Sequence, residues 1–237
     1  MDAILKNLEA VDWKNAQQKL NQQGYVVVEN VLSDKDCQEF IEDFENPERY
    51  RKNVDMERYR FGKGHYKYFK YPLPDTLSRL REYVYPKLVP VANQWMSNLK
   101  LDINFPAELS ALRKKCAENG QQLATPLILK YTKGGFNTLH QDLYGDVYFP
   151  MQAVLFLNEV EKHYTGGEFV MTQQIPRAQS KAMVLRPKKG SMLIFTTNYR
   201  PLQGKKGHYR VTMKHGVSEV HSGERYTLGI IFHDATT

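Results

Sequence analysis

Apolar residues recur at helical spacing along the first half of the chain. Ile4, Leu8 and Val11 mark such a face near the start, and Gly24 follows it as a helix terminator. Ser33 with acidic residues after it is typical of a helix N-terminus. The helices predicted in this half span residues 3–22, 33–46, 76–100 (interrupted near Pro86 and Pro90) and 107–118.

Short strand-like runs separated by Gly, Pro and Asn replace the helical pattern from residue 125 onward. Closely spaced short strands are typical of a sandwich or barrel. The fold class we predict is mainly β with N-terminal helices, in a single domain over residues 1–237. Residues 1–124 would form a helical and basic support, and residues 125–237 the β core. The predicted strands span residues 25–28, 126–132, 147–158, 167–171, 182–186, 190–196, 209–214 and 225–233.

The composition excludes several classes of protein. The 237 residues are 41% hydrophobic and 25% charged, which is typical of a globular domain and unlike a disordered or collagenous chain. No apolar run approaches the roughly 18 residues of a membrane span, and the first residues lack the apolar stretch of a secretory signal. Two cysteines cannot build a disulfide framework. We therefore expect a cytoplasmic protein with no membrane association.

Positive charge is concentrated in two segments. Residues 169–218 contain ten Lys or Arg and no Asp or Glu, and residues 58–70 contain five more without an acid. The net charge is +7, so the rest of the chain sums to −8. Such a distribution suits an anionic partner, although it is equally typical of a solvated face.

Two metal-ligand side chains, His140 and Asp142, stand on either side of Gln141. On an extended backbone, residues two positions apart point to the same face, so an imidazole nitrogen and a carboxylate oxygen can bind one ion. A third ligand must come from a distant strand. This is the arrangement of the 2-His-1-carboxylate triad of non-haem Fe(II), which leaves coordination positions open.

Residues 215–233 contain candidates for the third metal ligand and for a cation that binds a carboxylate. His215 opens a segment that we expect to turn near residue 222 and to return as a strand beginning near Arg225. Such a hairpin would place His215 on the iron and Arg225 deeper in the same barrel. A guanidinium binds a carboxylate through two parallel hydrogen bonds, and Thr227 adds a hydroxyl on the same face. The pattern predicts a 2-oxo acid that chelates the metal and reaches Arg225 with its far carboxylate.

These motifs resemble the Fe(II)/2-oxoglutarate-dependent oxygenases, whose core is a double-stranded β-helix, or jelly roll, of cupin-like type. The resemblance covers roughly residues 125–233 and extends to a bacterial subgroup described as oxidative demethylases of alkylated nucleic acid. The matching features, in order, are Tyr131 with Gly134 and Gly135, His140 with Asp142, Gly166–Glu168, Gly190–Phe195, His215–Val217 and Arg225–Thr227.

The resemblance implies a site and a reaction. Fe(II) binds His140, Asp142 and His215, while 2-oxoglutarate chelates the iron and pairs with Arg225, and Tyr131 adds a hydrogen bond. Dioxygen is the oxidant, and the products are succinate, CO2 and a hydroxylated C–H bond. Hydroxylation of an N-methyl group releases formaldehyde. Related repair enzymes carry a second Arg six positions after the first, where this chain has Ile231.

Two segments are candidates for substrate contact, because cations can bind phosphates and aromatic rings can stack on bases. The first segment, residues 58–70, alternates aromatic residues with Lys and Arg. The other is a Gly- and Pro-rich stretch over residues 198–210 that we expect to be a mobile loop. A two-sided strand and a solvated loop are the alternatives for these segments. The candidates are Arg58, Tyr59, Arg60, Tyr66, Tyr68, Arg200, Lys205, Lys206 and Arg210.

Three functions stay open at this point. The first is oxidative demethylation of alkylated nucleic acid. The second is hydroxylation of a protein or amino acid, as in prolyl-hydroxylase-like enzymes, with an acidic protein or a small molecule as the partner. The third is a non-catalytic cupin-type binding protein. His221 and His233 are the alternatives to His215 as the third ligand. The oligomeric state has no signal in the sequence.

Overall fold

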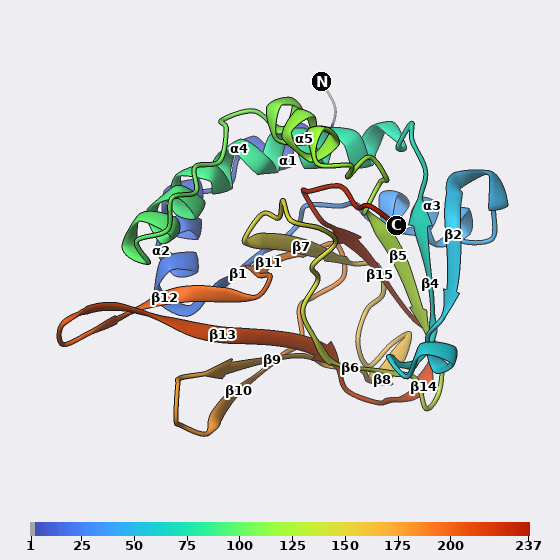
Figure 1. The fold of residues 1–237 in the computed structure, drawn as a ribbon. Coiled ribbons are helices and arrows are strands. Elements are labelled where there is room, and N and C mark those ends of the chain that lie inside the picture. The colour runs from blue at the N-terminus through green and yellow to red at the C-terminus, as the bar shows by residue number, and fades with distance from the viewer. Residues whose placement is uncertain (1–2) are drawn as a thin grey trace.

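The computed structural model describes residues 3–237 and shows two facing β-sheets with helices packed on the outside of one of them (Figure 1). This confirms the mainly β fold with N-terminal helices. The helices are α1 (Ala3–Glu9), α2 (Trp13–Gln23), α3 (Asp34–Asp43), α4 (Asp75–Asn98) and α5 (Leu109–Glu118), with single 3-10 turns η1 (Pro47–Arg49) and η2 (Met56–Tyr59).

Two antiparallel sheets form the core. The larger has the order β1-β11-β7-β15-β5-β4-β2, and the smaller β10-β9-β13-β6-β3, with β12 paired to β13 and a separate β14-β8 ribbon. The bounds are β1 (Tyr25–Val28), β2 (Tyr50–Asp55), β3 (Gly62–Lys63), β4 (His65–Phe69), β5 (Leu127–Tyr131), β6 (Phe136–His140), β7 (Met151–Phe156), β8 (Tyr164–Gly166), β9 (Phe169–Gln174), β10 (Ser180–Leu185), β11 (Met192–Thr196), β12 (Tyr199–Gly204), β13 (Gly207–Val217), β14 (Val220–Gly223) and β15 (Arg225–Ile230).

Side-chain alternation along β7 separates the two largest buried clusters of the interior. On β7, Ala153 and Leu155 pack toward the helices, while Val154 and Phe156 face the smaller sheet. Both faces of this strand are buried, and its sequence is accordingly almost continuously apolar. The polar exception, Gln152, is 3% exposed and points into the space between the sheets.

Two helix predictions were wrong in detail. The segment 3–22 forms two helices, because the Asp12 side chain accepts a hydrogen bond from the Asn15 N–H and caps a new helix. The segment 76–100 is one continuous helix, α4, with both prolines inside it. Eleven of its side chains are buried along its whole length, and this packing outweighs the two missing backbone donors.

The prediction of a mobile loop over residues 198–210 was also wrong. The segment forms the β12–β13 hairpin, with Tyr199 opposite Thr212 and a two-residue turn between Gly204 and Gly207. The hairpin projects well away from the body of the protein (Figure 1). Strands β1 to β4 from the first 124 residues also join the two sheets. Among the helices of residues 3–237, none has the length and apolar character needed to cross a membrane.

Candidate metal centre and co-substrate pocket

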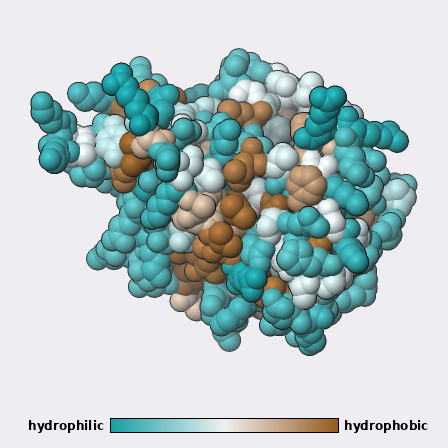
Figure 2. Space-filling view, turned by 90° about the horizontal axis from the view of Figure 1, so that it is seen from below, coloured by the Kyte–Doolittle hydropathy of each residue, from teal (hydrophilic) through white to brown (hydrophobic). Residues whose placement is uncertain are grey.

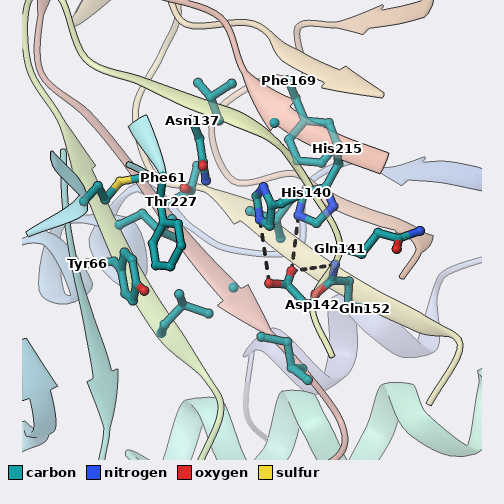
Figure 3. Close-up of a pocket in the computed structure, with 18 of the residues that line it drawn as sticks. Phe61, Tyr66, Asn137, His140, Gln141, Asp142, Gln152, Phe169, His215 and Thr227 are labelled. Atoms are coloured by element: carbon teal, nitrogen blue, oxygen red, sulfur yellow. Dashed lines mark hydrogen bonds and ion pairs between the residues drawn. The ribbon is translucent and has the colours of Figure 1, made fainter. Parts of the chain in front are cut away.

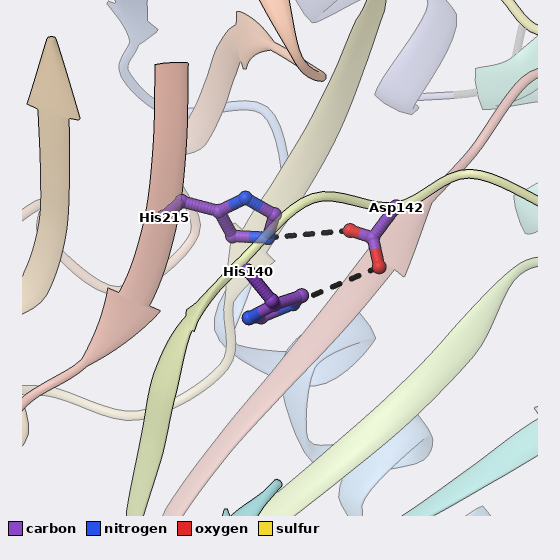
Figure 4. Close-up of side chains that lie close together, drawn as sticks. All are labelled: His140, Asp142 and His215. Carbon is purple, nitrogen blue, oxygen red and sulfur yellow. Dashed lines mark ion pairs between the residues drawn. The ribbon is translucent and has the colours of Figure 1, made fainter. Parts of the chain in front are cut away.

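His140, Asp142 and His215 meet in the space between the two sheets (Figure 4). One ligand atom from each lies within 4.8 Å of the others. His215 on β13 stands directly opposite His140 on β6, and the two ring centres are 4.2 Å apart. Asp142 follows β6, with Oδ2 3.2 Å from His215 Nε2 and Oδ1 3.6 Å from His140 Nε2. The structure therefore brings together the predicted triad.

The protonation and orientation of the two imidazole rings favour binding of a metal cation. His140 Nδ1–H donates to the Thr138 carbonyl oxygen at 2.7 Å, which leaves the Nε2 lone pair facing the other ligands. Burial and the neighbouring His140 lower the pKa of His215, so its ring is neutral at physiological pH. The Phe195 and Phe169 rings pack against His215 at 4.8 and 5.8 Å and restrict its orientation.

Two residues that sequence analysis missed hold the Asp142 carboxylate. Tyr144 Oη donates to Oδ1 at 2.9 Å, and Gln152 Nε2 donates to Oδ2 at 2.9 Å. Burial opposes ionisation of Asp142, but the two imidazoles and the Gln152 amide outweigh it and keep the pKa of the carboxyl well below its usual value. A polar residue inside the apolar strand β7 was the signal available for Gln152.

Tyr144→Phe should weaken metal binding by about 10- to 100-fold, the usual effect of removing a hydrogen bond to a metal ligand. Burial and the Asp142 charge raise the pKa of Tyr144, so this hydroxyl stays protonated and always donates. Titration of the purified chain with Co(II), followed by its visible absorption, measures the affinity. Tyr148→Phe is the matched control, because that hydroxyl bonds Tyr199 and not the carboxylate. Equal affinities for the two variants would contradict the prediction.

Arg225 carries a buried guanidinium that has no carboxylate partner among residues 3–237. It is 1% exposed and lies among the Tyr131, Phe156 and Tyr164 rings at 5.5 to 5.9 Å. Its Nη1 lies 3.4 Å from Thr227 Oγ1, while Nε and Nη2 are buried without partners within residues 3–237. Because buried polar groups are normally satisfied, these donors indicate an anionic ligand.

The neighbours of Arg225 complete this anion site. Tyr131 Oη is also buried with no hydrogen-bond partner in the described part of the chain, and burial raises the pKa of this hydroxyl to about 12, so it is a donor. Tyr131, Arg225 and Thr227 line the same cavity of about 250 Å³ as the triad, and Figure 3 shows Thr227 beside it. The orphaned donors and the triad fit 2-oxoglutarate and Fe(II).

The route by which Arg225 reaches this cavity differs from the predicted hairpin. β13, with His215, belongs to the smaller sheet, whereas β15, with Arg225, lies in the larger sheet between β7 and β5. The intervening β14 pairs with β8 and not with β15. The chain crosses from one sheet to the other over these ten residues, so the two side chains approach the cavity from opposite walls.

The alternatives for the third ligand lie elsewhere. His233 is buried, accepts a hydrogen bond from the Phe149 N–H through Nδ1, and has a pKa lowered to about 4 by burial. His221 is exposed on β14.

The candidate substrate residues fall into separate places. Tyr66 and Tyr68 line the cavity, whereas Arg58, Tyr59 and Arg60 are exposed beside it on η2 and the following residue. Arg200 is 2% exposed and donates to Gln173 and to the Asn21 carbonyl oxygen, so its cation is used inside the fold. This burial is the reason why Arg200 cannot contact a substrate as predicted. Lys205, Lys206 and Arg210 are exposed on the β12–β13 hairpin.

A protein family described as an oxygenase catalysing oxidative methylation of damaged DNA matches residues 64–235. The chain belongs to this oxygenase family. Two uncharacterized proteins of Mycobacterium tuberculosis, from strains CDC 1551 and H37Rv, are each 42% identical to this oxygenase over 167 residues. Those matches cover 70% of this chain and 72% of each relative.

Solved structures of similar fold include two prolyl hydroxylases and an oxidoreductase of the 2OG-Fe(II) oxygenase family. A Pseudomonas putida prolyl-4-hydroxylase has a TM-score of 0.56 at 15% identity, covering 94% of this chain and 98% of its own. A Burkholderia pseudomallei oxidoreductase of the 2OG-Fe(II) oxygenase family has a TM-score of 0.54 at 14% identity, covering 96% and 95%. A Trichoplax adhaerens prolyl hydroxylase in complex with a peptide of hypoxia inducible factor has a TM-score of 0.55 at 13% identity, covering 98% and 92%.

Family, fold and site agree on the class of enzyme. The sheets have the double-stranded β-helix architecture of those structures, and the triad with its buried guanidinium supplies the matching chemistry. This oxygenase is accordingly an Fe(II)- and 2-oxoglutarate-dependent enzyme that uses dioxygen.

Proposed function

We propose that this oxygenase demethylates alkylated nucleic acid by hydroxylating an N-methyl C–H bond. The observation that carries the proposal is the cation- and ring-bearing segment of residues 58–63, which lies beside the mouth of the metal cavity. Cations bind phosphates without reading sequence, and rings take the faces of bases. The family description, which concerns damaged DNA, supports the same substrate class.

The residues of the chain have separate roles in this reaction. His140, Asp142 and His215 would hold the metal, while Arg225, Thr227 and Tyr131 would receive the far carboxylate of 2-oxoglutarate. Bound together, Fe(II) and 2-oxoglutarate activate dioxygen for C–H hydroxylation. The apolar Ile231, 2% exposed in the cavity wall, excludes water and leaves Arg225 as the cation that faces the co-substrate.

The exposed hairpin cations extend the proposed nucleic-acid surface. Lys205 and Lys206 stand at the hairpin turn, about 30 Å along β13 from His215 at the usual rise per strand residue. They would contact the backbone of a bound strand at a distance from the reacting base. Arg210 lies over the Tyr199 ring at 4.3 Å and would add a third cation. A cytoplasmic location is part of the proposal, because both cysteines are free.

A protein or amino acid hydroxylase is the second candidate. The fold likeness to prolyl hydroxylases, one of them solved with a peptide, favours it. The exposed cations would then bind an acidic protein.

Release of formaldehyde and succinate in equal amounts from methylated oligonucleotides tests the proposal. We expect both products from the wild-type chain with Fe(II) and 2-oxoglutarate, and neither from His140→Ala or Asp142→Ala, because each substitution removes a metal ligand. Val184→Ala, at an exposed position on β10, is the control that should keep full activity. Turnover of proline peptides with no turnover of any oligonucleotide would favour the second candidate.

A further inference from the structure

Two exposed aromatic rings stand as a stacked pair beside the metal cavity. Tyr59 and Phe61 are 56% and 46% exposed, and their ring centres lie 5.5 Å apart with an angle of 17° between the planes. Each covers one face of the other. Exposed aromatic rings cost free energy in water, so a pair held open to solvent marks a binding surface. Figure 2 shows that the face seen from below is hydrophilic around its edge and carries a band of apolar side chains across its middle.

The backbone that carries these rings is held against the strand of the metal ligands. The Phe61 carbonyl oxygen accepts hydrogen bonds from the Thr138 N–H at 2.9 Å and from Thr138 Oγ1 at 2.8 Å. Gly62, at φ +138°, pairs with Asn137, and a Cβ there would lie 2.2 Å from the Phe136 carbonyl oxygen. The close approach requires glycine. It holds Phe61 against Thr138, which lies two positions before His140 in the chain.

Phe61 faces the cavity and Tyr59 supports it from outside. Phe61 is part of the cavity lining, whereas Tyr59 is not. In Figure 3, Phe61 and Tyr66 stand on one side of the space and His140, Asp142 and His215 on the other. A flat ring resting on Phe61 would therefore lie between this wall and the metal ligands.

The charges around the pair favour a nucleic acid over a peptide. Arg58, Arg60 and Lys63 are exposed within the same six residues. Arg58 makes a 3.8 Å contact with Asp55, and that carboxylate also caps η2 by accepting from the Glu57 N–H. Three cations next to a ring match a base with its flanking phosphates.

We propose that the cavity face of Phe61, backed by Tyr59, is the stacking platform for one unpaired base of a single-stranded nucleic acid. This inference rests on the proposed function and names the form of its substrate. A base inside a duplex has both faces covered by its neighbours, so it cannot rest on Phe61 without leaving the stack.

Binding of an oligonucleotide with one 2-aminopurine, single-stranded or in a duplex, tests the platform without turnover. Fluorescence of this base falls when it stacks on a ring. We expect the full chain to bind the single strand at least about 10-fold more tightly than the duplex, with quenching. Phe61→Ala should weaken that binding by about 5- to 150-fold, the usual effect of losing one base–ring contact. Phe61→Tyr should retain it, and Val184→Ala is the exposed apolar control.

The outcomes separate this inference from the proposed function. Equal binding of single strand and duplex, or wild-type affinity in Phe61→Ala, would overturn the platform. If Phe61→Ala keeps wild-type affinity and the wild-type chain demethylates oligonucleotides, the proposed function stands and only the platform is wrong. Failure of the wild-type chain to bind or demethylate any oligonucleotide, with a proline peptide bound through Phe61 instead, would overturn both.

Discussion

Arg225→Leu should raise the 2-oxoglutarate concentration needed for half-maximal succinate formation by about 30-fold or more. Truncating one partner of a buried hydrogen-bonded charge pair usually costs at least about 2 kcal/mol of binding free energy, which corresponds to that factor. The side chain is 1% exposed, so water cannot replace the lost donors. Succinate formation over a range of 2-oxoglutarate concentrations measures the effect.

Arg225→Leu is not expected to destabilise the protein without its ligands. Nε and Nη2 of Arg225 are buried without partners within the described chain, so replacing the guanidinium by the shorter, apolar leucine removes these unpaired donors and should leave thermal stability unchanged or raise it. Arg225→Lys keeps the charge but loses the two-pronged geometry, and we expect an intermediate affinity. A loss of stability that parallels the loss of affinity would mean that Arg225 is structural.

Asp234→Ala should lower the free energy of unfolding by about 3–5 kcal/mol, the usual cost of leaving a buried charge without its partner. Asp234 is 2% exposed, and its carboxylate accepts from Arg81 Nη2 at 3.0 Å and from the Tyr71 hydroxyl at 2.7 Å. Arg81 is 1% exposed and also donates to the Ile231 and Phe232 carbonyl oxygens. The substitution leaves this guanidinium buried and without its anionic partner. Urea denaturation measures the change.

Two further variants separate charge from packing at this ion pair. Arg113→Ala removes a partner of Asp234 whose side chain is 44% exposed, and it should cost less than about 1 kcal/mol. The double variant Arg81→Leu with Asp234→Leu removes both buried charges and should recover much of the stability. If the double variant is as unstable as the sum of the single ones, the ion pair is not the cause.

The proposed metal ligands and Arg225 were visible in the sequence because each belongs to a short motif with its own chemistry. His140 is the last residue of β6 and Asp142 lies two positions further on in extended chain, and Arg225 and Thr227 repeat that spacing within β15. The local rule of strand alternation places each pair on one face. Buried strands such as β11 were equally visible, because both of their faces are apolar.

The features that the sequence did not reveal depend on partners distant in the chain. Tyr144 is one of fifteen tyrosines, and only the turn after β6 directs its hydroxyl to Asp142. Arg200 looks like a surface cation until β9 and α2 bring Gln173 and Asn21 to it. The prolines of α4 oppose helix locally, and their tolerance reflects packing along the whole helix.

Because the chain crosses from one sheet to the other between β13 and β15, a bound co-substrate would connect the two sheets. His215 stands on one wall of the barrel and Arg225 on the other. A dicarboxylate bound to the metal at one end and to Arg225 at the other would link the two sheets by non-covalent contacts. Metal and 2-oxoglutarate together should therefore delay thermal unfolding by more than the sum of their separate effects. The form with both ligands bound would be the more rigid one, and substrate would bind to this rigid form.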